Sequence, residues 1–125
     1  MKIPIVVSFE GKYVKIRSDG DKTYEHSEDM WQTVGDACRK HDCYHVLGIA
    51  ETNRPLPVID GIDLPQMFQQ AGITSDYKIA WVELNTDAFE AVQFLETVLV
   101  NRYFNVRLFS EITAAKEWLL GDRDS

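Results

Sequence analysis

The sequence predicts an α/β fold: a sandwich with a mainly parallel mixed sheet and helices packed on it. Two observations support this class. Segments rich in β-branched residues alternate with segments whose apolar residues recur at helical spacing. The chain also begins with two short β-rich segments joined by a turn. The expected order is an N-terminal β-hairpin followed by α-β-α-β-α-β-α, and such alternation favours parallel strands with helices on the faces.

The hairpin is predicted from residues 3–9 (IPIVVSF) and 13–17 (YVKIR), which favour strands. Gly11 lies between them and supplies the positive φ that a tight hairpin turn needs. Residues 18–21 (SDGD) form a second turn, and residues 23–25 are expected to be a short extended segment.

The first helix is expected to begin with Ser27 as its N-cap, because acidic residues follow where the helix dipole favours them. His26, just before this start, is expected to be a surface turn residue. Trp31 lies one position off the apolar stripe and marks a candidate partner or pocket surface. The stripe itself has five members at helical spacing: Met30, Val34, Ala37, Cys38 and His41.

A buried strand is predicted at residues 44–50, followed by a long connection over residues 51–63 that Pro55 and Pro57 keep irregular. Asp63 then caps a short helix, with Gln66 as its capping-box partner.

Residues 77–84 are apolar on both faces and predict a central parallel strand. Thr86 is expected to cap the longest helix, over about residues 87–102. A short strand at residues 105–109 follows, and Ser110 caps a final helix over residues 111–120. The broad apolar face of the longest helix is expected to be buried and has five members: Phe89, Val92, Leu95, Val98 and Leu99.

Composition narrows the classes of function. The chain has 125 residues, which suits one domain spanning 1–125, and a formal net charge of −7. Such an acidic surface disfavours nucleic-acid binding and docking on anionic lipids. No apolar run approaches the about 20 residues needed to span a bilayer, and the first residues do not resemble a signal peptide. We therefore expect a cytoplasmic protein with two free thiols.

Residues 36–45 (DACRKHDCYH) contain both cysteines and two of the three histidines. Cys38 and His41 can share a helix face, and Cys43 and His45 can share a strand face, which together would offer four zinc-type ligands. Against this, Cys38 belongs to the apolar stripe, and the spacings match none of the usual zinc patterns. We expect a helix end running into a buried strand, with no metal and no cofactor.

Polar residues follow two of the predicted strands at their carboxyl ends, where open α/β sheets bind ligands. They are Glu51, Thr52, Asn53 and Arg54 after one strand, and Glu83, Asn85 and Thr86 after the other. Glu51 and Glu83 could perform acid/base chemistry, or both could be solvated strand ends. No nucleophile with an adjacent base accompanies them, so we expect no catalytic residues and no enzyme.

The connection over residues 52–63 exceeds the usual length between strand and helix, and long loops are often functional. The alternative is a proline-stiffened loop that only covers the core. The candidate ligand- or partner-binding residues in and after this loop are Thr52, Asn53, Arg54, Asp60, Gln66 and Gln69.

Several segments resemble the SpoIIAA-like (STAS/SEC14-type) domain family. Residues 79–120 contain an R-x-F strand, Arg107–Phe109, followed by an A-x-x-W-L helix, Ala115–Leu119. Residues 22–31 (KTYEHSEDMW) and 44–53 (YHVLGIAETN) also fall where such a domain would have them. The resemblance spans almost the whole chain and implies a small α/β sandwich used in bacterial regulation.

Within that family, anti-sigma-factor antagonists bind a partner kinase and are switched by phosphorylation in a D-S-x-G-like motif after the central strand. Here residues 51–57 read ETNRPLP, and Thr52 is the only hydroxyl, so the resemblance does not carry over the phosphoserine switch. The SEC14-like branch implies apolar ligands.

The sequence therefore leaves two main hypotheses. The first is a non-enzymatic regulatory or protein-interaction domain. The second is a small-molecule or lipid-binding protein, with a pocket for a small apolar or anionic ligand at the carboxyl edge of the sheet. A homodimer is compatible with an edge hairpin.

Overall fold

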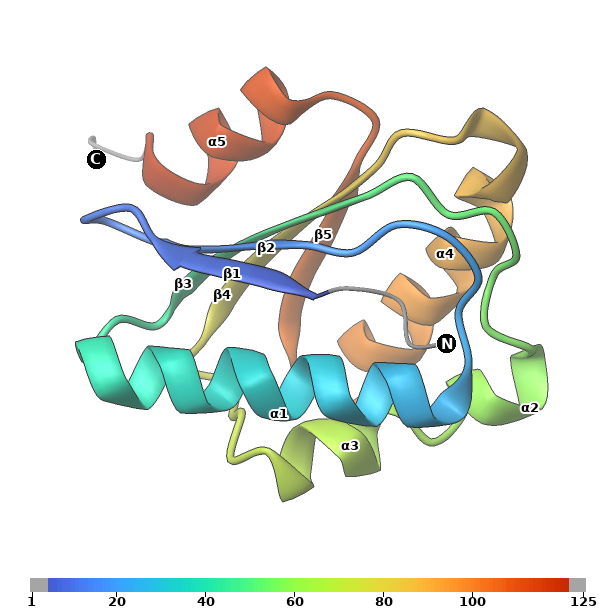
Figure 1. Cartoon of the computed structure of the whole chain (residues 1–125), viewed down its shortest axis with the longest axis horizontal. Coiled ribbons are helices and arrows are strands. Elements are labelled where there is room, and N and C mark those ends of the chain that lie inside the picture. Colours follow the sequence, from blue (N-terminus) through green and yellow to red (C-terminus); the bar gives the residue numbers. More distant parts are fainter. Residues whose placement is uncertain (1–4, 122–125) are drawn as a thin grey trace.

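A computed structural model describes residues 5–121 as one five-stranded sheet with helices on both faces (Figure 1). The helix α5 covers one face, and α1, α3 and α4 pack on the other. In chain order the elements are β1 (Val6–Phe9), β2 (Val14–Arg17), α1 (Tyr24–His41), β3 (His45–Ala50), α2 (Val58–Gly61), α3 (Leu64–Gln70), β4 (Lys78–Glu83), α4 (Thr86–Val100), β5 (Asn105–Phe109) and α5 (Ile112–Leu120).

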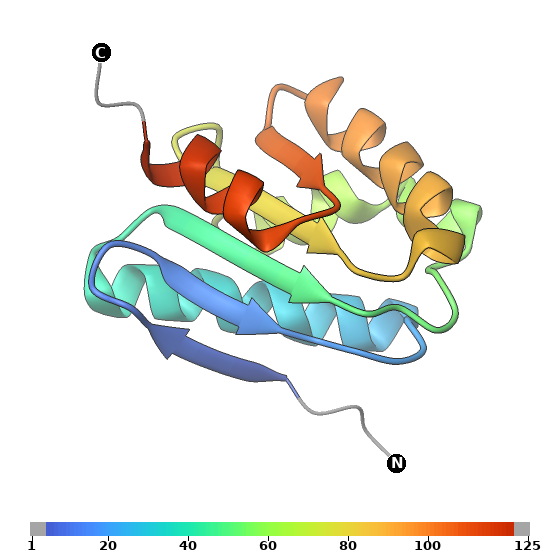
Figure 2. The same cartoon turned by 90° about the horizontal axis from the view of Figure 1, so that it is seen from above.

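The strands follow the chain order across the sheet, β1-β2-β3-β4-β5. The β1–β2 pair is antiparallel, and every other pair is parallel. This confirms the predicted fold class. The carboxyl ends of β2, β3 and β4 meet at one edge, where the connections to α1, α2 and α4 begin (Figure 2). Residues 3–4 of the predicted first strand lie outside the described residues.

Apolar side chains form one cluster on each face of the sheet. The larger cluster joins alternate residues of β2–β5 to α1, α3 and α4, and the smaller one packs α5 over β3 and β4. On β4, Ile79 belongs to the larger cluster, whereas Ala80 and Val82 belong to the smaller one. The strand is therefore covered on both faces, as its sequence predicts. No helix within residues 5–121 has the length and apolar character to cross a membrane.

The start of α1 differs from the prediction. The helix begins at Tyr24, and Thr23 is its N-cap, with Oγ1 accepting a hydrogen bond from the backbone N–H of His26 at 3.1 Å. Ser27 therefore lies inside the helix and is buried. The prediction of a surface turn for His26 is wrong, because its ring is buried and its Nε2 lies 2.6 Å from Ser18 Oγ.

Two other predicted caps are wrong, and a third is right only in its position. Asn85, rather than Thr86, caps α4 by accepting from the backbone N–H of Asp87. Asp63 occupies the N-cap position of α3 but forms no cap hydrogen bond and no capping box with Gln66. Its carboxylate instead accepts from the Tyr24 hydroxyl at 3.2 Å. The N-cap of α5 is Glu111, without a side-chain hydrogen bond, rather than Ser110.

Three further expectations need correction. The connection over residues 51–63 is not irregular throughout, because α2 forms within it. With 15 residues, α4 is shorter than α1, which has 18. Only Leu99 of the five predicted buried residues of α4 is fully buried. The other four are partly exposed, which leaves room beside this helix.

Candidate functional site

A cavity of about 70 Å³ lies beneath the connection after β3, between the sheet, α1 and α4. Most of its lining is apolar. The apolar residues are Met30, Trp31, Pro55, Leu56, Leu64, Trp81, Val92, Leu95, Leu99, Val106 and Leu108. The polar residues are Lys22, Ser27, Thr52 and Glu96. The cavity thus lies near the sheet edge where the sequence predicts a ligand pocket.

Two tryptophans form one wall. The ring centroids of Trp31 and Trp81 lie 5.5 Å apart, and Trp31 also packs on Phe68 at 4.5 Å. Trp31, proposed above as a partner or pocket surface, is almost fully buried and lines the cavity. The opposite wall comes from α4, where Val92 and Leu95 are only partly buried.

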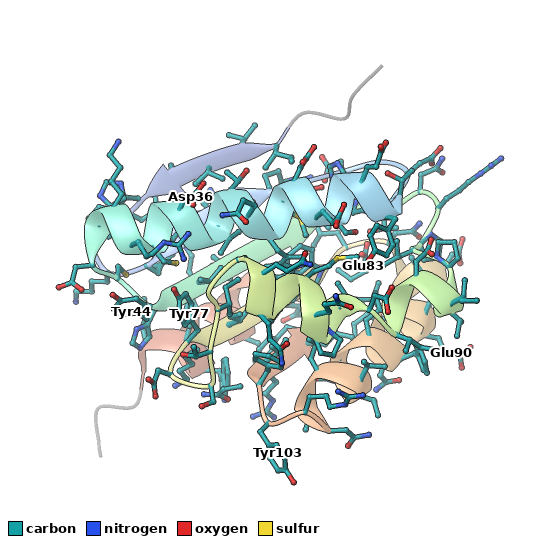
Figure 3. The ribbon with its side chains drawn as sticks, turned by 90° about the horizontal axis from the view of Figure 1, so that it is seen from below. Asp36, Tyr44, Tyr77, Glu83, Glu90 and Tyr103 are labelled. Carbon is teal, nitrogen blue, oxygen red and sulfur yellow. The ribbon has the colours of Figure 1, made fainter. Side chains whose placement is uncertain are left out.

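A group of polar residues, here named the carboxyl-edge cluster, joins the ends of β3 and β4: Thr52 and Glu83, which are buried, and Asn85, which is partly buried. Glu83 is 1% exposed and can be located in Figure 3. Its two oxygens accept from the Thr52 hydroxyl at 2.6 Å and the Thr52 N–H at 2.8 Å. The Asn85 N–H adds a third bond at 3.1 Å, and its side-chain amide donates to the Thr52 carbonyl at 2.5 Å. All three residues are therefore fixed by one another.

Lys22 joins the segment before α1 to this edge. Its backbone N–H donates to the Arg54 carbonyl at 2.8 Å. Its ammonium nitrogen Nζ donates to the carbonyls of Ser18 at 3.0 Å and Gly20 at 3.4 Å. Burial lowers the pKa of Lys22, while the negative charge of Glu83 acts in the opposite direction. No sequence pattern singled out Lys22.

Ser18 and His26 form a second buried polar contact near Lys22. Burial lowers the pKa of His26, and the charge of Lys22 lowers it further. The only sequence signal for this contact is that Ser18 directly follows β2, at the turn that leads into α1. The prediction missed His26 because it began the helix at Ser27 and left His26 in a turn outside it. In the structure the helix begins at Tyr24, and His26 is one of its buried residues.

The predicted site residues fall into two groups. Thr52 is buried within the carboxyl-edge cluster, whereas Asn53 and Arg54 are exposed beside it. The amide of Asn53 donates to Asp21 at 2.7 Å, which ties the loop to the segment before α1. Asp60 lies on α2. The two glutamines, Gln66 and Gln69, are exposed on α3, and neither lines the cavity.

The two carboxylates considered for acid/base chemistry differ in environment. Glu51 is exposed, as a solvated strand end would be, and its backbone N–H donates to Asp19 at 2.8 Å. Glu83 is not a solvated strand end, because Thr52 and Asn85 occupy its oxygens.

The residues weighed as zinc ligands point to different partners. Cys38 is buried in the larger apolar cluster. The Cys43 thiol donates to the Lys12 carbonyl at 3.5 Å and the His45 carbonyl at 3.8 Å. His41 stacks on Phe9 with 4.3 Å between ring centroids. In the part of the chain that the structure describes, no group of three or more His, Cys, Asp or Glu could hold a metal ion.

One apolar surface patch lies on and after α2. Val58, Ile59 and Ile62 are 61%, 77% and 54% exposed, respectively. Phe94 of α4, also partly exposed, lies near Gly61 and extends this α2 patch. Sequence reasoning missed it, because residues 58–62 were assigned to an irregular loop.

The five-stranded mixed sheet, the N-terminal hairpin and the helices on both faces together define a SpoIIAA-like fold. A solved structure with this fold is similar over nearly the whole chain: an uncharacterized protein of the DUF3478 family from Shewanella loihica PV-4. The two share 17% sequence identity with a TM-score of 0.58, over 94% of this chain and 93% of the other. No protein-family model and no curated protein sequence matches this chain.

Proposed function

We propose that the protein is a non-enzymatic binding protein for a small, neutral, apolar molecule, held in the cavity between the sheet, α1 and α4. One observation carries this proposal. The cavity is lined by apolar side chains, and the polar groups at its margin are already engaged with the protein. Pockets of this composition, near the carboxyl edge of an α/β sheet, are typical ligand sites.

The hydrogen bonds at the margin favour a neutral ligand. The Thr52 hydroxyl donates to Glu83, and Glu96 accepts from the Leu108 N–H at 2.7 Å. Within residues 5–121, no buried side-chain nitrogen or oxygen lacks a hydrogen-bond partner. A polar ligand group buried here away from Lys22 would have to go unpaired, at a cost of about 1–3 kcal/mol. Of the two ligand types expected from the sequence, apolar and anionic, these contacts favour the apolar one.

The size of the cavity also limits the ligand. Its volume of about 70 Å³ is less than the roughly 150 Å³ of an engineered apolar cavity that binds benzene. A ligand of that size therefore requires α4 to move outward. Val92 and Leu95 make this step feasible, since partly exposed apolar residues hold a helix less firmly than buried ones.

The first experiment is a titration with toluene, followed through the fluorescence of the cavity tryptophans. We expect saturable binding to the wild-type chain. Val92→Phe should weaken it by filling the cavity, while Val100→Phe, an equally sized change at an exposed position of α4, should not. Native mass spectrometry of freshly purified protein then searches for a co-purified apolar molecule. Absence of saturation, or equal binding by both variants, would contradict the proposal.

A second candidate is the regulatory or protein-interaction domain that the family resemblance implies. The α2 patch supports it, because exposed apolar residues gathered on one short segment are typical of interaction surfaces. A phosphorylation switch at Thr52 has no support, since its hydroxyl is buried against Glu83.

A pull-down tests the interaction hypothesis. Ile59→Asp places a charge in the patch, and Val100→Asp is the matched control on an exposed part of α4. We expect a partner to be retained by the wild type and the control and lost by Ile59→Asp. Recovery of the same proteins by all three chains would contradict this function.

A further inference from the structure

We propose that Lys22 forms a reversible imine with a small apolar aldehyde bound in the cavity; this inference rests on the proposed binding function. Among the described residues, Lys22 is the only lysine that lines the cavity. Most of the other lining residues are apolar, so a hydrocarbon chain would lie against them while its carbonyl meets the amine.

The hydrogen bonds of Lys22 can be made by a neutral amine as well as by an ammonium group. A neutral amine has two N–H donors and one lone pair, whereas an ammonium group has three donors and none. Two backbone carbonyls, of Ser18 and Gly20, lie at 3.0 and 3.4 Å from Nζ and match two donors. These two bonds would leave the lone pair of the neutral form available to attack a carbonyl carbon.

The surroundings also favour the reactive form. Burial lowers the pKa of Lys22, which increases its neutral fraction, as in other lysines that form Schiff bases. The nearby charge of Glu83 opposes this effect and would stabilise the protonated imine once it has formed.

The reaction balances without an oxidant or reductant. The Nζ lone pair attacks the aldehyde carbon, the C=O π electrons move to oxygen, and a proton passes from nitrogen to that oxygen to give a carbinolamine. The hydroxyl then leaves as water with a second proton, and the C=N bond forms. The net change is one amine and one aldehyde to one imine and one water. An apolar cavity that excludes water protects the imine from hydrolysis.

The test traps the imine in the native protein. The chain is incubated with hexanal and cyanoborohydride, which reduces an imine to a stable secondary amine, and the modified lysines are located by peptide mass spectrometry. We expect Lys22 to gain a hexyl group before the exposed Lys40 and Lys116. Added toluene should abolish this preference by competing for the cavity, while leaving modification of the exposed lysines unchanged.

Two variants complete the experiment. Lys22→Arg keeps the positive charge but forms no imine under these conditions, so we expect preferential labelling at this position to be lost. Lys116→Arg is the matched surface control and should label at Lys22 as the wild type does. Labelling of wild-type Lys22 no faster than Lys40 would overturn the inference while leaving the toluene result intact. Labelling that toluene does not inhibit would also overturn it, because the reaction would then not require the cavity.

Discussion

Trp81 occupies the space in which a side chain at Gly48 would lie. The two residues are register partners on the neighbouring strands β3 and β4, and a Cβ built on Gly48 would overlap Cε3 and Cζ3 of the indole. The absence of a side chain on β3 therefore lets the ring lie over the sheet, against Trp31. Because both tryptophans line the cavity, Gly48 determines the shape of the proposed site.

Gly48→Ala should destabilise the fold by about 1–3 kcal/mol, the usual cost of overpacking a core. Urea unfolding followed by circular dichroism measures this change. Trp81→Leu in the same chain should relieve the overlap, so the double variant should be more stable than the sum of the two single effects predicts. Strictly additive effects would show that the two side chains do not compete for this space.

The fold could be predicted because the patterns that define it are local. Alternating strand-like and helix-like segments identified every strand, and the apolar faces of residues 77–84 correctly placed β4 inside the sheet. Helix starts were less predictable, because Thr23 and Ser27 are both good N-caps by residue type. The choice between them depends on a distant contact, Ser18 with His26, that no local pattern reveals.

The site was predictable only in its position. Parallel strands place their carboxyl ends at one edge, so Thr52 and Glu83 were expected near each other, and they share two hydrogen bonds. Which carboxylate is buried could not be predicted, because it depends on the strand register, in which Glu83 pairs with Ala50 and Glu51 lies one residue beyond the end of β3. Lys22 belongs to no catalytic or binding motif, and it is held at the edge by hydrogen bonds to the backbone carbonyls of residues 18, 20 and 54.

Thr52→Val should cost about 1.5–3 kcal/mol of unfolding free energy, because it removes a hydrogen bond to a buried carboxylate without changing the side-chain shape. Thr52→Ser keeps the hydroxyl and should retain most of that stability. Thermal and urea unfolding of both variants provide the comparison. Equal losses in the two variants would mean that the methyl group, and not the bond to Glu83, stabilises this edge.

His26 should make stability depend on pH. Its pKa in the folded protein is lowered from 6.5 by burial and by Lys22, so the unfolded chain binds more protons below that value. The contribution of His26 is therefore complete above pH 6.5 and is lost as pH falls through the lowered pKa. Urea unfolding at a series of pH values should show a shallower decline for His26→Gln than for the wild type. Parallel declines would contradict this assignment.

Gly61→Ala should reduce toluene binding. A Cβ at Gly61 would overlap Cδ2 of Leu95, a flexible side chain of the cavity wall, so Leu95 must shift. The overlapping atom is a side-chain end, so we expect the variant to fold with a modest loss of stability. The toluene titration described above gives the affinity. Binding at the wild-type level would show that Leu95 moves away from the cavity rather than into it.

The two cysteines should react with a thiol reagent at very different rates. Cys38 is fully buried, and burial raises its pKa to about 12, so it presents almost no thiolate near neutral pH. Cys43 is partly exposed. Ellman's reagent should therefore modify one thiol per native chain rapidly and the second only after denaturation. Cys43→Ser should remove the rapid phase, whereas Cys38→Ala should leave it unchanged. Rapid modification of both thiols in the native wild type would contradict this, because it would show that the core around Cys38 opens to solvent.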